Sequence, residues 1–165
     1  MKELLINLIE ALREELKQYG EMLALLDQQQ HLVMQRQVVA LPENVNSVNA
    51  QAAVITTARK EREQRQLHLA RILGLAENSG VTALLPKLPS DYQPLVGALL
   101  EENNSLLTRV QQRARQNHLL LSHAVDLMSQ LINSIFPSAK PVTYDGAGHK
   151  SSVKLPAQPL YEAVG

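Results

Sequence analysis

The carboxylates and histidines of this chain are the side chains that would hold a metal or move a proton, and their spacing supports neither chemistry. Di-iron bundles place a histidine three residues after a glutamate on one helix, and no Glu here has a histidine at that distance. His118 and His123 are five residues apart, so on a helix they point in different directions. The chain has no cysteine, no phosphate-binding glycine loop and no G-x-S-x-G. We therefore expect no enzyme, no metal site and no cofactor.

A second candidate is the stretch TYDGAGHK, Thr143 to Lys150. A tyrosine offers a large contact area and one hydrogen-bonding tip, which makes it frequent at the centre of protein interfaces. The neighbouring Asp and Gly are also good turn formers, so an alternative is that Tyr144 packs against the chain's own helices. We predict that the tail meets a partner through six residues: Tyr144, Asp145, Gly146, Gly148, Leu155 and Tyr161.

Composition limits the class of protein. The chain has 165 residues, 45% of them apolar and only 3% aromatic, so the core must be aliphatic. Lys+Arg and Asp+Glu balance at 16 each, which gives no net field to attract nucleic acid or anionic lipid. The basic stretch ARKEREQR, 58–65, is interrupted by glutamates and predicts a solvated helix face. The chain has no signal-peptide pattern and no membrane-length apolar run, so we expect a cytoplasmic protein.

The first helical segment has apolar residues every three or four positions, which is typical of an amphipathic helix. These are Leu5, Leu8, Leu12, Leu16, Tyr19, Leu23, Leu26 and Val33. Gly20 falls inside this helix, where a close contact with another helix would explain it, but so would chance.

A loop is expected at VVALPENVNS, 38–47, with Asn44, Asn46 or Ser47 as the cap of a second helix. This helix runs to about Leu73 with Gly74 as its C-cap. Its polar middle, TTARKEREQRQ, predicts solvent on most sides.

VTALL, 81–85, predicts one short helical turn stopped by Pro86, and Ser90 or Asp91 then caps the third helix. The third helix keeps a 3.5-residue spacing, which predicts coiled-coil-like packing. Its inner positions are Tyr92, Val96, Leu99, Asn103, Leu106, Val110, Arg113, Asn117, Leu120, Ala124, Leu127, Leu131 and Ser134.

Together these segments predict an all-α fold: an antiparallel bundle of three long helices, one short accessory helix and an extended C-terminal tail. Four prolines after Phe136 exclude a continuing helix. We therefore predict a helical domain at 1–136 and a flexible, Pro-containing tail at 137–165.

Three stretches resemble the FlgN-type flagellar export chaperones: LREELKQYGEMLALLDQQQHLV, then RQLHLARILGL, then RQNHLLLSHAVDLMSQLI followed by TYDGAG. The resemblance spans most of residues 1–150, and the order of the stretches carries it. The start of the second helix departs from the usual pattern of that family.

The resemblance implies a bacterial cytoplasmic protein that covers a terminal amphipathic helix of a hook-associated (hook–filament junction) protein. It also implies that the complex is presented to the type III export gate, with the Tyr144 region touching the gate. An apolar stripe on a helix can itself receive a partner helix. The expected client-binding residues are Val110, Asn117, Leu120, Leu121, Ala124, Leu127, Met128, Leu131 and Ile135. The alternative is a self-assembling structural or adaptor bundle with no role in secretion.

Overall fold

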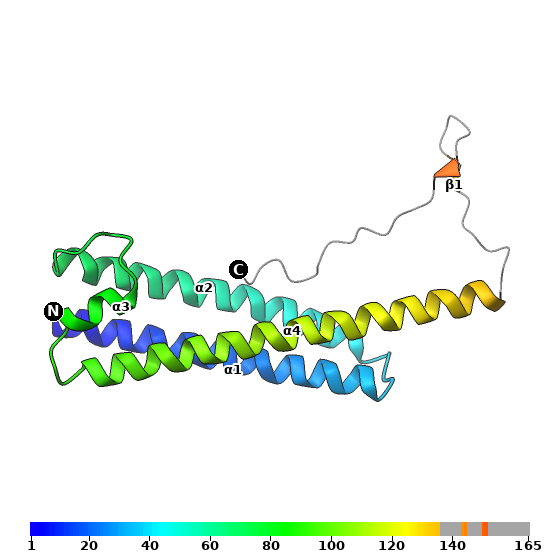
Figure 1. Ribbon diagram of the computed structural model, residues 1–165, viewed down its shortest axis with the longest axis horizontal. Helices are drawn as coiled ribbons and strands as arrows, with labels where there is room; N and C mark the ends of the chain where they lie inside the picture. Colours follow the sequence, from blue (N-terminus) through cyan, green and yellow to red (C-terminus); the bar gives the residue numbers. More distant parts are fainter. Residues whose placement is uncertain (136–142, 145–149, 152–165) are drawn as a thin grey trace. The chain divides into compact units, whose positions relative to one another are not determined.

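The computed structural model describes residues 1–135, 143–144 and 150–151. Three long helices, α1 (Lys2–Met34), α2 (Leu41–Ile72) and α4 (Gln93–Ile135), form the described part together with a short helix α3 (Val81–Leu84) and a 3₁₀ turn η1 (Leu85–Lys87) (Figure 1). The predicted all-α bundle with one accessory helix is therefore confirmed.

Two short strands follow α4. Strands β1 (Thr143–Tyr144) and β2 (Lys150–Ser151) pair antiparallel, with Thr143 opposite Ser151 and Tyr144 opposite Lys150. The rest of the expected tail lies outside the described residues. Its extended conformation, and the division of the chain at 136/137, therefore stay predictions.

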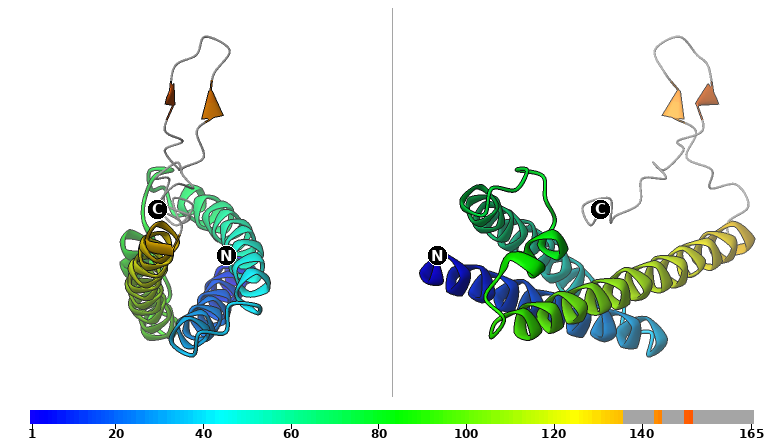
Figure 2. Two further views of the ribbon diagram at one scale, coloured as in Figure 1. Left: turned by 90° about the vertical axis from the view of Figure 1, so that its right-hand side faces the viewer. Right: turned by 60° about the vertical axis from the view of Figure 1, so that its left-hand side comes forward.

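The chain divides into two compact units, Met1–Ala114 and Arg115–Gly165. In the first unit, α1 lies between α2 and α4, and α2 runs in the opposite direction to the other two (Figures 1 and 2). The main core gathers where α1, α2 and α4 meet α3. Its buried members are Leu5, Leu8, Ile9, Leu12, Leu69, Ala70, Val81, Leu84, Leu88, Val96 and Leu99. The short α3 closes this end of the unit with Val81 and Leu84, which is why a four-residue helix is retained there.

The end of α2 was predicted correctly. Gly74 has a φ of 67°, and the Leu75 N–H donates to the Ala70 carbonyl at 3.0 Å, which is the usual glycine-based termination of a helix. The end of α1 has the same geometry without a glycine. Arg36 has a φ of 55°, and the Gln37 N–H donates to the Leu32 carbonyl at 2.9 Å.

The predicted start of the second helix was wrong. The helix begins at Leu41, and Pro42 lies in its first turn, where the missing N–H costs no hydrogen bond. Asn44 is a buried helical residue and not a cap, and its Nδ2 donates to the Leu25 carbonyl of α1 at 3.1 Å.

Of the two explanations for Gly20, a close contact or chance, the described structure does not support the close contact. A Cβ placed there would meet no atom within 4 Å. Packing therefore does not require a glycine at this position.

Candidate functional site: the open segment of α4 and the buried polar cluster

The inner positions of α4 change from buried to exposed along one continuous helix. Val96, Asn103, Val110 and Asn117 are buried, whereas Leu127 is 66% exposed. No residue from 118 to 135 is buried, and we call this stretch the open segment of α4. The spacing of apolar residues does not change at this point, so the same apolar stripe is buried in the first part of the helix and exposed in the open segment.

The contacts of α4 with α1 extend at least as far as Arg113. Arg113 of α4 forms an ion pair with Asp27 of α1 at 2.8 Å and donates to the Gln30 side chain. Soon after this contact α1 ends at Met34, whereas α4 continues to Ile135.

The predicted client-binding residues divide into three groups. Val110 and Asn117 are buried, so neither offers a surface in the described structure. Leu120 and Leu121 are half-buried. The remaining five are exposed: Ala124, Leu127, Met128, Leu131 and Ile135.

Three exposed apolar residues of the open segment were not predicted: Leu119, Val125 and Ile132. Val125 and Ile132 lie four residues after Leu121 and Met128, so helical spacing alone could have identified them. Seven of the fifteen exposed large apolar residues in the described chain lie in this segment, and a cluster of that kind marks an interaction surface.

The predicted partner residues of the tail are only partly described. Tyr144 lies in β1, where its backbone pairs with Lys150. The other five, Asp145, Gly146, Gly148, Leu155 and Tyr161, lie outside the described residues.

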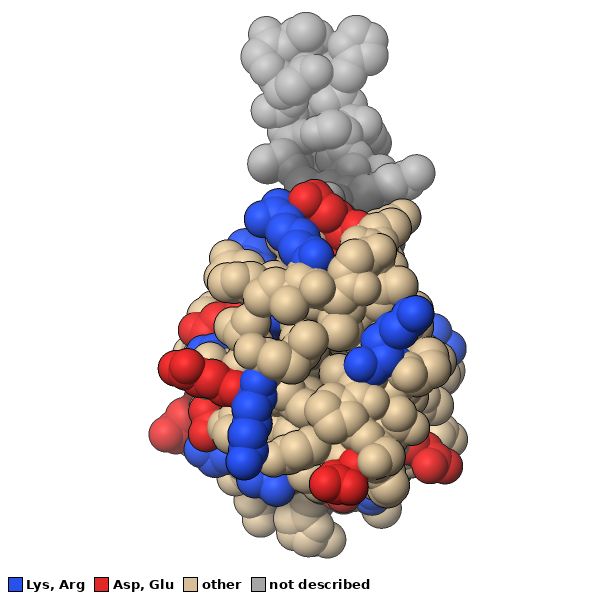
Figure 3. Space-filling model, turned by 90° about the vertical axis from the view of Figure 1, so that its left-hand side faces the viewer, with Lys and Arg blue, Asp and Glu red and all other residues tan. Residues whose placement is uncertain are grey.

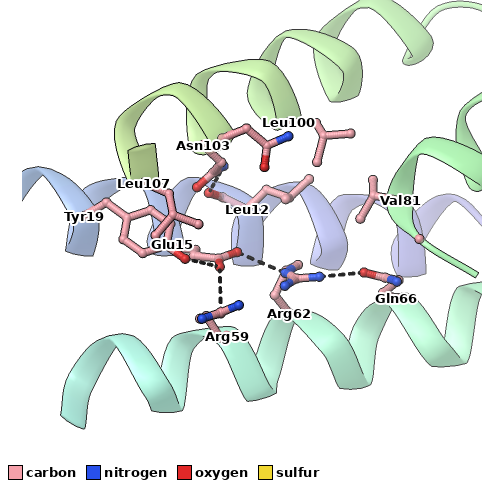
Figure 4. A pocket seen from close by; sticks show the side chains of 12 residues that line it. Leu12, Glu15, Tyr19, Arg59, Arg62, Gln66, Val81, Leu100, Asn103 and Leu107 are labelled. Atoms are coloured by element: carbon pink, nitrogen blue, oxygen red, sulfur yellow. Dashed lines mark hydrogen bonds and ion pairs between the residues drawn. The ribbon is translucent and has the colours of Figure 1, made fainter. Parts of the chain in front are cut away.

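A buried polar cluster joins α1 to α2 (Figure 4). The Glu15 carboxylate accepts a hydrogen bond from the Tyr19 hydroxyl at 2.8 Å and one from Arg62 Nε at 3.0 Å. Arg59 Nε lies 3.9 Å from the same carboxylate. Burial, and after it the hydrogen bond to Glu15, raises the pKa of Tyr19 above its usual value, because both favour the protonated phenol.

This cluster corrects the expectation for one side of the polar middle of α2. Arg59 and Arg62 turn inward to Glu15. The exposed residues of this stretch are Thr56, Thr57, Lys60, Glu61, Glu63 and Gln64. Glu15 was missed because Leu16 looks like the better inner residue. The step from Leu8 to Leu12 is four residues, so strict alternation requires a step of three next, which selects Glu15, and then a step of four to Tyr19.

The cluster lines a cavity of about 170 Å³ together with residues of α4. There Asn103 Nδ2 donates to the Leu12 carbonyl of α1 at 3.0 Å (Figure 4). Both α2 and α4 are thus attached to α1 by a buried polar contact as well as by apolar packing. Such contacts fix the register of helices more than they add stability.

On the face drawn in Figure 3, basic and acidic residues are interspersed. Among the residues that the structure describes, no three His, Cys, Asp or Glu side chains gather as metal ligands would. Within the same residues, no helix has the length and apolar character needed to cross a membrane.

A comparison with protein families matches residues 1–152 to the FlgN family, described as FlgN protein. The match covers nearly the whole chain, so the protein belongs to the FlgN family. This is a family of flagellar export chaperones and not of enzymes, which agrees with the resemblance seen in the sequence. No curated protein and no solved structure matches the chain.

Proposed function

We propose that this protein is a cytoplasmic export chaperone that binds the terminal amphipathic helix of a flagellar hook-associated protein on the open segment of α4. One observation carries the proposal. The inner positions of α4 keep their spacing from Val96 to Leu131, but they are buried only as far as Asn117. A client helix would continue the packing that α1 provides earlier along α4.

The expected affinity is moderate. Full burial of a large aliphatic side chain contributes about 1.5–3 kcal/mol. Leu127, Met128 and Leu131 are each a little more than half exposed, so covering them contributes roughly 1 kcal/mol apiece. Ordering the client helix offsets part of this gain. The complex would hide the client's own apolar stripe before export, preventing premature assembly, and would still release it.

Delivery to the export gate is a second part of the proposal. We assign it to the tail, 137–165, through Tyr144, Asp145, Gly146, Gly148, Leu155 and Tyr161. The support is the resemblance to the family and the presence of apolar and aromatic residues that a plain linker does not need. Tyr144→Ala should reduce export while leaving helicity unchanged, and a lower melting temperature would instead mean that Tyr144 packs on the helices.

Calorimetry with a synthetic peptide of the client's terminal helix tests the main site. The variant Leu127→Ser/Leu131→Ser loses about 2 kcal/mol of contact, so affinity should fall about 30-fold. Val39→Ser is the matched control, because Val39 is 97% exposed in the connection between α1 and α2. Equal affinity of the double variant and the control would refute the site, provided that circular dichroism shows equal helicity.

Self-assembly is the competing function for the same surface. It predicts that sedimentation at two protein concentrations gives different masses, and that the Leu127→Ser/Leu131→Ser variant is monomeric at both. A wild-type mass independent of concentration would favour the chaperone.

A further inference from the structure

The open segment of α4 is almost free of charge. Among residues 118–135, Asp126 is the one Lys, Arg, Asp or Glu. By contrast, α1 carries nine such residues among its 33, so the scarcity is local and not a property of the whole chain.

The positions next to the inner positions of α4 show whether charge can select a partner helix. In paired helices the residues that flank the inner positions on each side are commonly Glu and Lys, and their ion pairs select the partner and its direction. On one side of the open segment these positions are Leu121, Met128 and Ile135. On the other side they are His123 and Gln130.

Asp126 does not take this role. It lies two residues after Ala124 and one before Leu127, on the outer side of the helix. Leu121, Met128 and Ile135 instead widen the apolar stripe, and Met128 adds an unbranched side chain that adapts to different neighbours.

We propose that the open segment recognises client helices by their apolar stripe alone and does not distinguish them by flanking charge. The partner is an amphipathic helix with a broad apolar face and flanks of either sign. Such a site could accept several clients of different charge. This inference depends on the proposed function, since it concerns the same surface.

Two designed peptides test it. Both carry one identical apolar stripe, and their flanking positions are all Lys in one and all Glu in the other. Binding to the full chain is measured by calorimetry at about 50 mM and about 500 mM NaCl, because salt at the higher concentration screens exposed pairs. We expect the four dissociation constants to agree within about threefold.

Other results would show that flanking charge does matter or that the peptides do not bind the open segment. A preference above about tenfold for one peptide, or a tenfold loss of affinity in high salt, would overturn the inference. The terminal helix of the hook-associated protein is titrated in parallel. If that helix binds and neither designed peptide does, the inference fails and the proposed function stands. If that helix does not bind, the proposed function fails. A dimer of this chain that excludes both peptides would also overturn the inference.

A charge added to the flank gives a positive control within the same protein. Gln130 is exposed and lies beside Leu131. Gln130→Glu should make the Lys peptide bind several-fold tighter than the Glu peptide at low salt, and Gln130→Lys should reverse the order. Unchanged discrimination in both variants would place the peptides elsewhere on the chain and overturn the inference.

Discussion

Replacing Glu15 with glutamine tests whether the buried polar cluster holds α1 and α2 together. Among the described residues, Glu15 is the one carboxylate classed as buried. The change Glu15→Gln keeps the shape of the side chain but removes its charge. Arg62, whose side chain is only 17% exposed, then loses the negative charge 3.0 Å from its Nε.

The cost follows from the surroundings of Arg62. Removing one partner of a fully buried ion pair costs about 3–5 kcal/mol. Arg62 retains a second carboxylate, Glu63, at 3.6 Å and keeps some contact with solvent. We therefore expect a smaller loss, about 2 kcal/mol in the free energy of unfolding.

Urea denaturation followed by circular dichroism measures this loss. Glu14→Gln is the matched control, because Glu14 is the neighbouring residue, is 52% exposed and pairs with Lys17 at 4.0 Å. Glu14 also accepts a hydrogen bond from Gln18 at 2.6 Å, and the amide oxygen of glutamine can still accept it. The control should lose less than about 0.5 kcal/mol. Equal stability of the two variants would refute the structural role of the cluster. Glu15→Leu/Arg62→Leu removes both charges and should be more stable than Glu15→Gln.

Three further changes have defined outcomes. Arg36→Gly should raise the free energy of unfolding by up to about 1 kcal/mol, because Arg36 has a φ of 55°, which glycine adopts without strain. Gly74→Ala should lower it by about 1 kcal/mol, since its φ is 67°; both are measured in urea. The raised pKa of Tyr19 means that the folded state keeps the phenol proton longer than the unfolded chain does. The phenol therefore makes its full contribution to the free energy of unfolding at pH values below the unfolded pKa of about 10. Above that pH the free energy of unfolding falls by up to about 1.4 kcal/mol per pH unit. Tyr19→Phe should remove that part of the alkaline slope of stability.

Each of these predictions has a contrary result. If Arg36→Gly destabilises, the Arg36 side chain makes a contact that outweighs its backbone strain. Unchanged stability of Gly74→Ala would mean that the end of α2 rearranges at no cost. An alkaline slope that is identical in Tyr19→Phe would assign that slope to other groups.

The fold was predictable where the apolar spacing is regular. In α4 the steps of three and four residues extend across nearly the whole helix, and Gly74 ends α2 as expected. The start of α2 was not predictable from caps, because Pro42 can open a helix as readily as it can belong to a loop. At Arg36 the chain adopts a conformation that favours glycine, and the residue type gives no signal of it.

The candidate site was predictable in part. The apolar stripe of the open segment is visible in the sequence, but the point at which burial stops is not, because the spacing of apolar residues is the same on both sides of it. Val110 is buried because that part of α4 still contacts α1, as the ion pair of Arg113 with Asp27 shows, and this is a fact of tertiary packing. Glu15, Arg59 and Arg62 look like surface residues when each is considered alone. Their burial follows only when α1 and α2 are brought side by side.

A client helix that packs on the open segment of α4 would cover the exposed methyl groups of that segment. Methyl-labelled protein titrated with the terminal helix of a hook-associated protein, and observed by NMR, tests it most directly. We expect large shifts for the methyl groups of Leu127, Leu131 and Ile135, with those of the buried Leu5 and Leu8 unchanged. Saturable binding that leaves the three open-segment residues unshifted would contradict it.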